Sequence, residues 1–266
     1  MIRNLVFRVG LASVFVFPSA ARTQERDLGG ARPIKVRVHV ATMSLAGDTA
    51  TVSYVVENLR SGDEDLTSFQ VGAPAPVMDM PAPRLGHWLT EPRYGDHRIA
   101  QWTLYHSALL HPGESTSELV LVAQGIPDLV RYWATPNLMA HPADITDDPE
   151  RDDVFVFSDT GTTVGIVRVP ASATPVSLTT RLLALMRRSC GALGWIDQPG
   201  VCNSIEVKLT HVRDALAAGD VERARGELRA IASELDAQHG AQAGKHVSDE
   251  AYALLHPNVL FVLGRL

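Results

Sequence analysis

The sequence has little cysteine, no excess of positive charge and a mean hydropathy close to zero. Two cysteines among 266 residues exclude a small disulfide-rich scaffold and a zinc site built from four cysteines. A formal net charge of −6 argues against a general nucleic-acid-binding protein, which needs a basic surface to neutralise phosphates. A mean hydropathy of +0.02 excludes a protein with many membrane spans, and 45% hydrophobic residues exclude wholesale disorder. What remains is a mildly acidic globular protein of one or two domains.

Several catalytic signatures are also missing. The chain has no Gly-x-Ser-x-Gly motif, no Walker loop and no dinucleotide fingerprint. Its 10 histidines include no His-Glu-x-x-His motif, and His106 and His111 flank an apolar run without a carboxylate at ligand spacing. We therefore expect no cofactor, no metal and no catalytic residue that the sequence can name. An enzyme whose residues converge only in the folded chain stays open.

The N-terminus has the order of a secretory signal peptide. Arg3 and Arg8 are basic, Leu5 to Phe17 is almost wholly apolar, and small residues follow. This apolar run spans only ~20 Å as a helix, less than the ~30 Å of a hydrocarbon core. We predict a cleaved signal peptide at residues 1–21 and a linker at residues 22–32, with an uncleaved anchor as the alternative. The mature protein is then periplasmic or secreted, without stable membrane insertion.

Residues 33–169 follow the two-residue period of strands with one buried face. Apolar and basic residues alternate from Ile34 to Val40, and Gly47-Asp48 provides a turn before the alternating run Thr51–Glu57. Further strands are expected at residues 66–71, 101–105, 118–123, 153–157 and 163–169. Short strands separated by Gly, Pro and Asp, with no helical period between them, predict an antiparallel β-sandwich. This predicted sandwich resembles the immunoglobulin-like modules of exported proteins.

After a linker at residues 170–175 the period changes to 3.6, which predicts a small bundle of three or four helices at residues 176–266. The apolar stripes are Leu178, Leu182, Leu185 and Met186; Ile205, Leu209, Val212 and Leu216; Ala224, Leu228, Ile231 and Leu235; and Tyr252, Leu255, Val259 and Val262.

Four residues mark the expected helix ends. Asn203 is expected to cap the second helix, Gly219 to end it, and Asp220 to cap the third. Because the joint between these two helices is short, they should run antiparallel. The last helix should begin near Ser248, and Pro257 should bend it or split it at His256.

The helical segment resembles the FIMAH domain of exported bacterial proteins. The residues that carry the resemblance are Asn203-Ser204, Lys208-Leu209, the joint Ala217 to Asp220, Ala224, Leu228, Ile231 and Gly244-Lys245. Ala230 departs from the family, which more often has a large aromatic residue there. The resemblance implies a C-terminal accessory module on a secreted or surface protein, and it implies no chemistry.

Cys190 and Cys202 are predicted to form a structural disulfide. Cys190 ends the first predicted helix, Cys202 precedes the next, and the glycine-rich loop between them allows the approach that a disulfide requires. Two free buried thiols and a redox pair are the alternatives, although redox chemistry usually uses Cys-x-x-Cys beside a helix N-terminus.

Trp88, Trp102 and Trp133 fall near strand ends or loops, together with Tyr132. Exposed indole rings stack on sugar faces or peptides, so these tryptophans are a candidate ligand platform. The alternative is that each ring fills the core or an end of the sandwich.

Asp159-Thr160-Gly161-Thr162 is similar to the Asp-Thr-Gly motif of aspartic peptidases, which pair two such carboxylates. Only one copy is present, so we interpret the motif as a turn between two strands, with Gly161 at positive φ. A hydrolase based on Asp159 is kept as an alternative function.

The acidic run Asp144, Asp147, Asp148, Glu150, Asp152 and Asp153 lies in an expected surface loop at residues 137–153. Its carboxylates could bind calcium, as in a calcium-dependent surface adhesin, but the run lacks the spacing of a known calcium loop. A solvated loop is the simpler interpretation.

The combined prediction is an exported, non-catalytic envelope or extracellular protein. We expect an antiparallel β-sandwich followed by a helical bundle, acting as a binding or accessory module. Its partner would be a protein or glycan of the envelope, bound through exposed aromatic rings or sheet edges, and not a nucleic acid.

Overall fold

The computed structural model describes residues 34–62, 64–83, 88–93, 99–104, 109–136, 158–240 and 242–266. These residues all belong to one compact unit, Ala31–Leu266. The predicted signal peptide, the linker at residues 22–32, the strand expected at residues 153–157 and the acidic loop at residues 137–153 lie outside the described residues.

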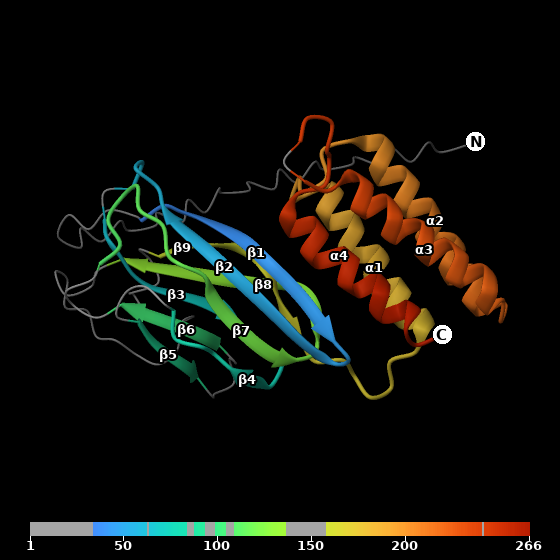
Figure 1. Cartoon of the computed structure of the whole chain (residues 1–266), viewed down its shortest axis with the longest axis horizontal. Coiled ribbons are helices and arrows are strands. Elements are labelled where there is room, and N and C mark those ends of the chain that lie inside the picture. The colour runs from blue at the N-terminus through green and yellow to red at the C-terminus, as the bar shows by residue number, and fades with distance from the viewer. Residues whose placement is uncertain are drawn as a thin grey trace, which may run out of the picture. The chain divides into compact units, whose positions relative to one another are not determined.

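Within the described residues, nine strands form two antiparallel sheets (Figure 1). The first sheet has the order β1 (Val36–Ala46), β2 (Thr49–Asn58), β7 (Leu119–Gln124), β4 (Val77–Asp79). The second has the order β5 (Trp88–Arg93), β6 (Ile99–Leu104), β3 (Leu66–Gly72), β8 (Ile126–Pro136), β9 (Asp159–Val167). This agrees with the expected antiparallel β-sheet class. Strands β4, β5 and β8 were not expected, and proline residues at their ends or beside them weakened the strand pattern.

The two sheets share an apolar core that contains three aromatic rings. Tyr54 lies 5.8 Å from Phe69 and 6.1 Å from Trp102 between ring centroids, and all three side chains are fully buried. The Tyr54 hydroxyl donates to the carbonyl of Val164 at 2.8 Å, which joins β2 of the first sheet to β9 of the second. Burial raises the pKa of this hydroxyl well above its usual value.

The predicted hairpin is present, with Gly47 at φ +65° between β1 and β2. The predicted turn at Asp159 to Thr162 is wrong. These residues form the start of β9, and Gly161 pairs with Tyr132 of β8 without positive φ. The glycine instead makes room, because a Cβ on Gly161 would lie 2.6 Å from Cε1 of Tyr132.

The C-terminal part forms four helices within the described residues: α1 (Pro175–Cys190), α2 (Pro199–Ala217), α3 (Val221–Gln238) and α4 (Asp249–Leu263). Figure 1 shows these helices packed beside one another. The predicted apolar stripes are buried, except that Leu216 and Tyr252 are half-buried. No described helix is long and apolar enough to cross a membrane.

Three of the four expected helix ends are confirmed. Gly219, at φ +78°, directly follows the C-cap of α2. Asp220 caps α3 by accepting from the Arg223 amide at 3.1 Å, and Ser248 caps α4. The expected cap at Asn203 is wrong, because α2 already begins at Pro199, whose fixed φ suits a first helical turn. Pro257 does not split α4, which runs through it.

Helix α4 contacts both parts of the chain, namely α1 and α3 on one side and β1, β8 and β9 on the other. This explains why it is apolar on nearly every side, with Leu254, Leu255 and Phe261 all buried. The side-chain amide of Asn258 donates to the carbonyl of Pro127 in β8 at 2.8 Å. The sandwich and the helices therefore share one continuous core along α4.

Candidate functional site

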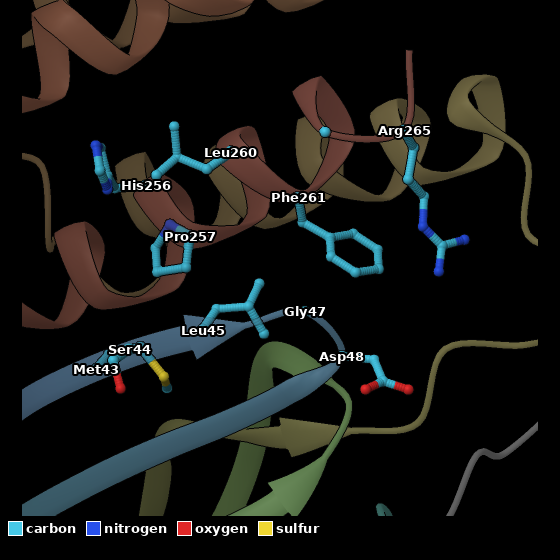
Figure 2. Close-up of a pocket in the computed structure, with 11 residues that line it drawn as sticks. Met43, Ser44, Leu45, Gly47, Asp48, His256, Pro257, Leu260, Phe261 and Arg265 are labelled. Atoms are coloured by element: carbon cyan, nitrogen blue, oxygen red, sulfur yellow. The ribbon is translucent and has the colours of Figure 1, made fainter.

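One cleft among the described residues, here called the β1–α4 cleft, lies between the end of β1 and the second half of α4 (Figure 2). Its volume is about 520 Å³, within the range of ~300–1,000 Å³ that is usual for small-molecule sites. The lining residues are Met43, Ser44, Leu45, Gly47, Asp48, His256, Pro257, Leu260, Phe261, Gly264 and Arg265.

The side-chain periods of β1 and α4 explain which residues form the walls of the β1–α4 cleft. In β1, Met43 pairs with Val52 and Leu45 with Ala50, so both side chains point to the face that the sandwich buries. In α4, the lining residues recur every three or four positions and therefore lie on one face of the helix. Figure 2 shows Leu45 of β1 directed toward Pro257 and Phe261 of α4.

Leu260 is the most exposed apolar residue of α4, with 46% of its surface accessible. It lines the cleft together with Phe261, which is buried, whereas Val259 is buried in the core and does not line the cleft. The helix thus presents an apolar side chain to solvent at a concave place, next to the half-buried Met43 and Leu45.

The other end of the cleft is charged. Asp48 and Arg265 line both the β1–α4 cleft and an adjoining polar hollow of about 210 Å³. Asp48 accepts a hydrogen bond from the Gln124 side chain at 2.8 Å, and the guanidinium of Arg265 lies 4.4 Å from the ring centroid of Phe261. Arg168, which is exposed at the end of β9, also lines this hollow.

His256 lines the opposite end of the cleft. Burial lowers the pKa of its imidazole, Asp236 raises it and His239 lowers it further. The ring stacks on Tyr252 with centroids 4.7 Å apart, and Nε2 lies 3.3 Å from a carboxylate oxygen of Asp236. The lowered pKa favours the neutral imidazole, so this end of the cleft carries no cation.

A polar cluster joins β1 to the start of α4. Nδ1 of His39 lies 3.0 Å from Glu250, and Nε2 lies 3.2 Å from Asp249, which also contacts His239 at 2.6 Å. These contacts hold the first half of α4 against β1 and so fix one end of the β1–α4 cleft. Among the described residues, no group of His, Cys, Asp or Glu is arranged to hold a metal ion.

The three candidate tryptophans do not form one platform. Trp102 is fully buried and pairs with Phe69, while Trp133 pairs with Gln70 and so lies on the opposite face of the sheet. Trp88 is half-buried and packs against the core. Trp102 is therefore a core residue, the alternative that the sequence left open.

Cys190 and Cys202 are joined as predicted, with their sulfur atoms 2.10 Å apart and their Cα atoms 6.0 Å apart. Because α2 starts earlier than expected, Cys202 lies in its first turn. The disulfide therefore ties the end of α1 directly to the start of α2.

Asp159 has structural partners. Its carboxylate accepts a hydrogen bond from the Val36 amide at 2.8 Å and lies 3.5 Å from Nζ of Lys35. It thus joins the start of β9 to the start of β1.

His111, which the sequence left without a partner, lies 2.7 Å from Asp65, whose hydrogen bond raises the pKa of the imidazole. His106 lies outside the described residues.

No protein-family model and no curated protein matches the chain, so the resemblance of residues 176–266 to the FIMAH domain stays a prediction. Among solved structures, an uncharacterized protein from Nocardia farcinica with an immunoglobulin-like fold matches at 14% identity and a TM-score of 0.31. That match covers 50% of this chain and 98% of the other.

Two glycosidase structures are also similar. An inactive D437A mutant of a GH20 exo-β-N-acetylglucosaminidase from Vibrio harveyi matches at 9% identity and a TM-score of 0.25, covering 52% of this chain and 18% of the enzyme. β-Glucosidase 3B from Thermotoga neapolitana matches at 17% identity and a TM-score of 0.20, covering 51% of this chain and 17% of the enzyme. All these TM-scores are too low to support a functional argument.

Proposed function

We propose that this chain is an exported, non-catalytic accessory module that binds an apolar group of an envelope partner in the β1–α4 cleft. The proposal includes an immunoglobulin-like sandwich at residues 33–169 and a FIMAH-like helical module at residues 176–266. Both kinds of module are expected on exported proteins, and neither is expected to supply chemistry of its own.

The exposure of Leu260 carries this proposal. Leu260 is 46% exposed and lines a cleft of about 520 Å³ together with Met43, Leu45, Pro257 and Phe261, and a cleft of this size with more apolar than polar lining is a candidate ligand site. The cleft walls favour an apolar group over a bare glycan, because sugar hydroxyls would lose hydrogen bonds to water there.

Two features support export. The N-terminal residues have the order of a signal peptide, and the Cys190–Cys202 disulfide belongs in an oxidising compartment. The expected location is the periplasm or the cell exterior.

Titration with Nile red, a neutral apolar dye, tests the proposed site. Dye fluorescence should rise on binding, and Leu260→Ser should weaken binding about fivefold because apolar area in the cleft is lost. Val207→Ser is the matched control, since Val207 is 43% exposed on α2, away from the cleft, and receives the same residue in a helix. Absence of dye binding, or equal binding by wild type and Leu260→Ser, would overturn the proposal.

A further inference from the structure

The β1–α4 cleft is elongated. On α4, its lining residues extend over successive turns from His256 to Arg265, which at 1.5 Å per residue is a length of about 14 Å. Along this length, Leu45 of β1 faces Pro257 and Phe261 of α4, and Met43 and Leu260 also line the cleft, so both elements contribute apolar residues to its walls. A narrow apolar cleft of this form fits a linear chain.

The two ends of the cleft differ in charge. The His256 end has a neutral imidazole, whereas the Arg265 end opens into the hollow that also contains Arg168. Arg265 lies near the C-terminal end of the chain and Arg168 directly follows β9, and among the described residues that line the hollow Asp48 is the one acid. Two guanidiniums and one carboxylate give the lining of the hollow an excess of positive charge, which favours an anionic group.

We propose that the β1–α4 cleft binds an unbranched acyl chain that ends in a carboxylate. The chain lies along α4 between Leu45 and Leu260, and the carboxylate lies in the hollow with Arg265 and Arg168. This inference rests on the proposed function and names its ligand class. A carboxylate matches the hollow better than a phosphate, because two arginines and one aspartate leave one net positive charge, and a phosphate carries about −1.5 to −2.

Calorimetric titration with decanoate, decanol and decyl phosphate, each below its micelle-forming concentration, tests this assignment. Decanoate should bind about fivefold to tenfold more tightly than decanol, because only the carboxylate gains charge-assisted hydrogen bonds. Arg265→Gln should remove most of that advantage and weaken decanol binding much less than decanoate binding, because Arg265 also packs on Phe261 in the cleft. Arg188→Gln is the matched control, since Arg188 is exposed on α1, outside both hollows, and lowers the net charge equally.

The outcomes separate the two proposals. If neither decanoate nor decanol binds, the apolar cleft itself is refuted and the proposed function fails with it. If decanol binds as tightly as decanoate, or if decyl phosphate binds most tightly, only the carboxylate assignment is overturned. A wild-type dimer that dissociates in Leu260→Ser, measured by light scattering, would make a second copy of the chain the occupant and overturn the acyl-chain proposal.

Discussion

At the scale of single residues, the packing of β9 against β8 depends on the absence of one side chain. Gly161 lies opposite Tyr132, and the place that a Cβ would occupy is 2.6 Å from Cε1 and 2.7 Å from the hydroxyl of that ring. Tyr132 in turn stacks near Phe69, with centroids 6.0 Å apart. The glycine therefore lets a large ring lie flat over the edge strand.

We expect Gly161→Ala to lower the free energy of unfolding by about 1–3 kcal/mol, because the ring must move out of its packed position. Gly226→Ala is the matched control. Gly226 lies within α3, and a Cβ there meets no atom within 4 Å, so this variant should gain about 0.5–1 kcal/mol from higher helix propensity. Urea unfolding measures both variants, and a stabilised Gly161→Ala would contradict the packing account.

Two histidines are expected to titrate on opposite sides of the ordinary pKa of 6.5. Burial lowers the pKa of His256, whereas the hydrogen bond that His111 donates to the Asp65 carboxylate raises the pKa of His111. Ring proton resonances followed by NMR as a function of pH check the order, with His256→Asn and His111→Asn assigning the signals.

The two pKa shifts determine how each histidine changes the free energy of unfolding with pH. His256 favours its neutral form in the folded chain, so its contribution to the free energy of unfolding is present above pH 6.5. This contribution is lost as the pH falls through the lowered pKa. His111 behaves in the opposite way, since its contribution is present below pH 6.5 and is lost as the pH rises through the raised pKa. A His256 signal that titrates above that of His111 would refute both assignments.

At the scale of elements, the helices are held by their ends as well as by their apolar faces. Thr174 and Ser177 form a reciprocal capping box at the start of α1, and Arg187 near its end pairs with Glu206 of α2 at 2.7 Å. The Cys190–Cys202 disulfide closes the connection between the same two helices. The α1–α2 connection is therefore the most constrained joint of the bundle.

Replacing both cysteines with serine should lower the free energy of unfolding by about 2–3 kcal/mol, because the unfolded chain regains the freedom of the closed loop. Thermal unfolding of wild type with and without dithiothreitol measures independently how much the same disulfide contributes to stability. Reduction should not change the stability of the double serine variant. Equal stability of oxidised and reduced wild type would show that the bond contributes nothing.

At the scale of the whole molecule, α4 is the element that joins the sandwich to the bundle. It packs on α1 and α3, and it also packs on β1 and β8. The contacts that cross between the parts include the hydrogen bond from Asn258 to Pro127 and the ion pair between Arg181 and Asp128. Separating the parts would break these contacts and expose to water the apolar residues of α4 that are buried against β1 and β8.

We expect one unfolding transition, followed by circular dichroism for the helices and by tryptophan fluorescence for the sandwich in a Trp195→Phe background, because Trp195 lies between α1 and α2. Asn258→Ala should lower the free energy of unfolding by about 1–3 kcal/mol, because the side-chain amide that joins α4 to β8 is buried. Asn203→Ala, at an exposed position of α2, is the matched control and should change little. Separate transitions in the Trp195→Phe background would mean that α4 does not couple the parts.

Much of the local structure was predictable because it depends on neighbours in the sequence. The hairpin at Gly47, the cap at Asp220 and the apolar stripes of α1, α2 and α3 follow from short-range patterns. The candidate site was not predictable in the same way. The residues that form the β1–α4 cleft carry no shared motif, and Leu260 falls outside the stripe that the periodicity assigned to the last helix.

The sequence by itself determined the change from strands to helices, most helix limits and the pairing of the two cysteines. Each of these rests on periodicity, caps or a short loop. Only the tertiary structure decided that Trp102 is a core residue, that Asp159 joins two strand ends, and that α4 has two buried sides. The physical reason is separation along the chain: the contact of His39 with Glu250 spans 211 residues, and no local pattern encodes which distant surface will cover an apolar face.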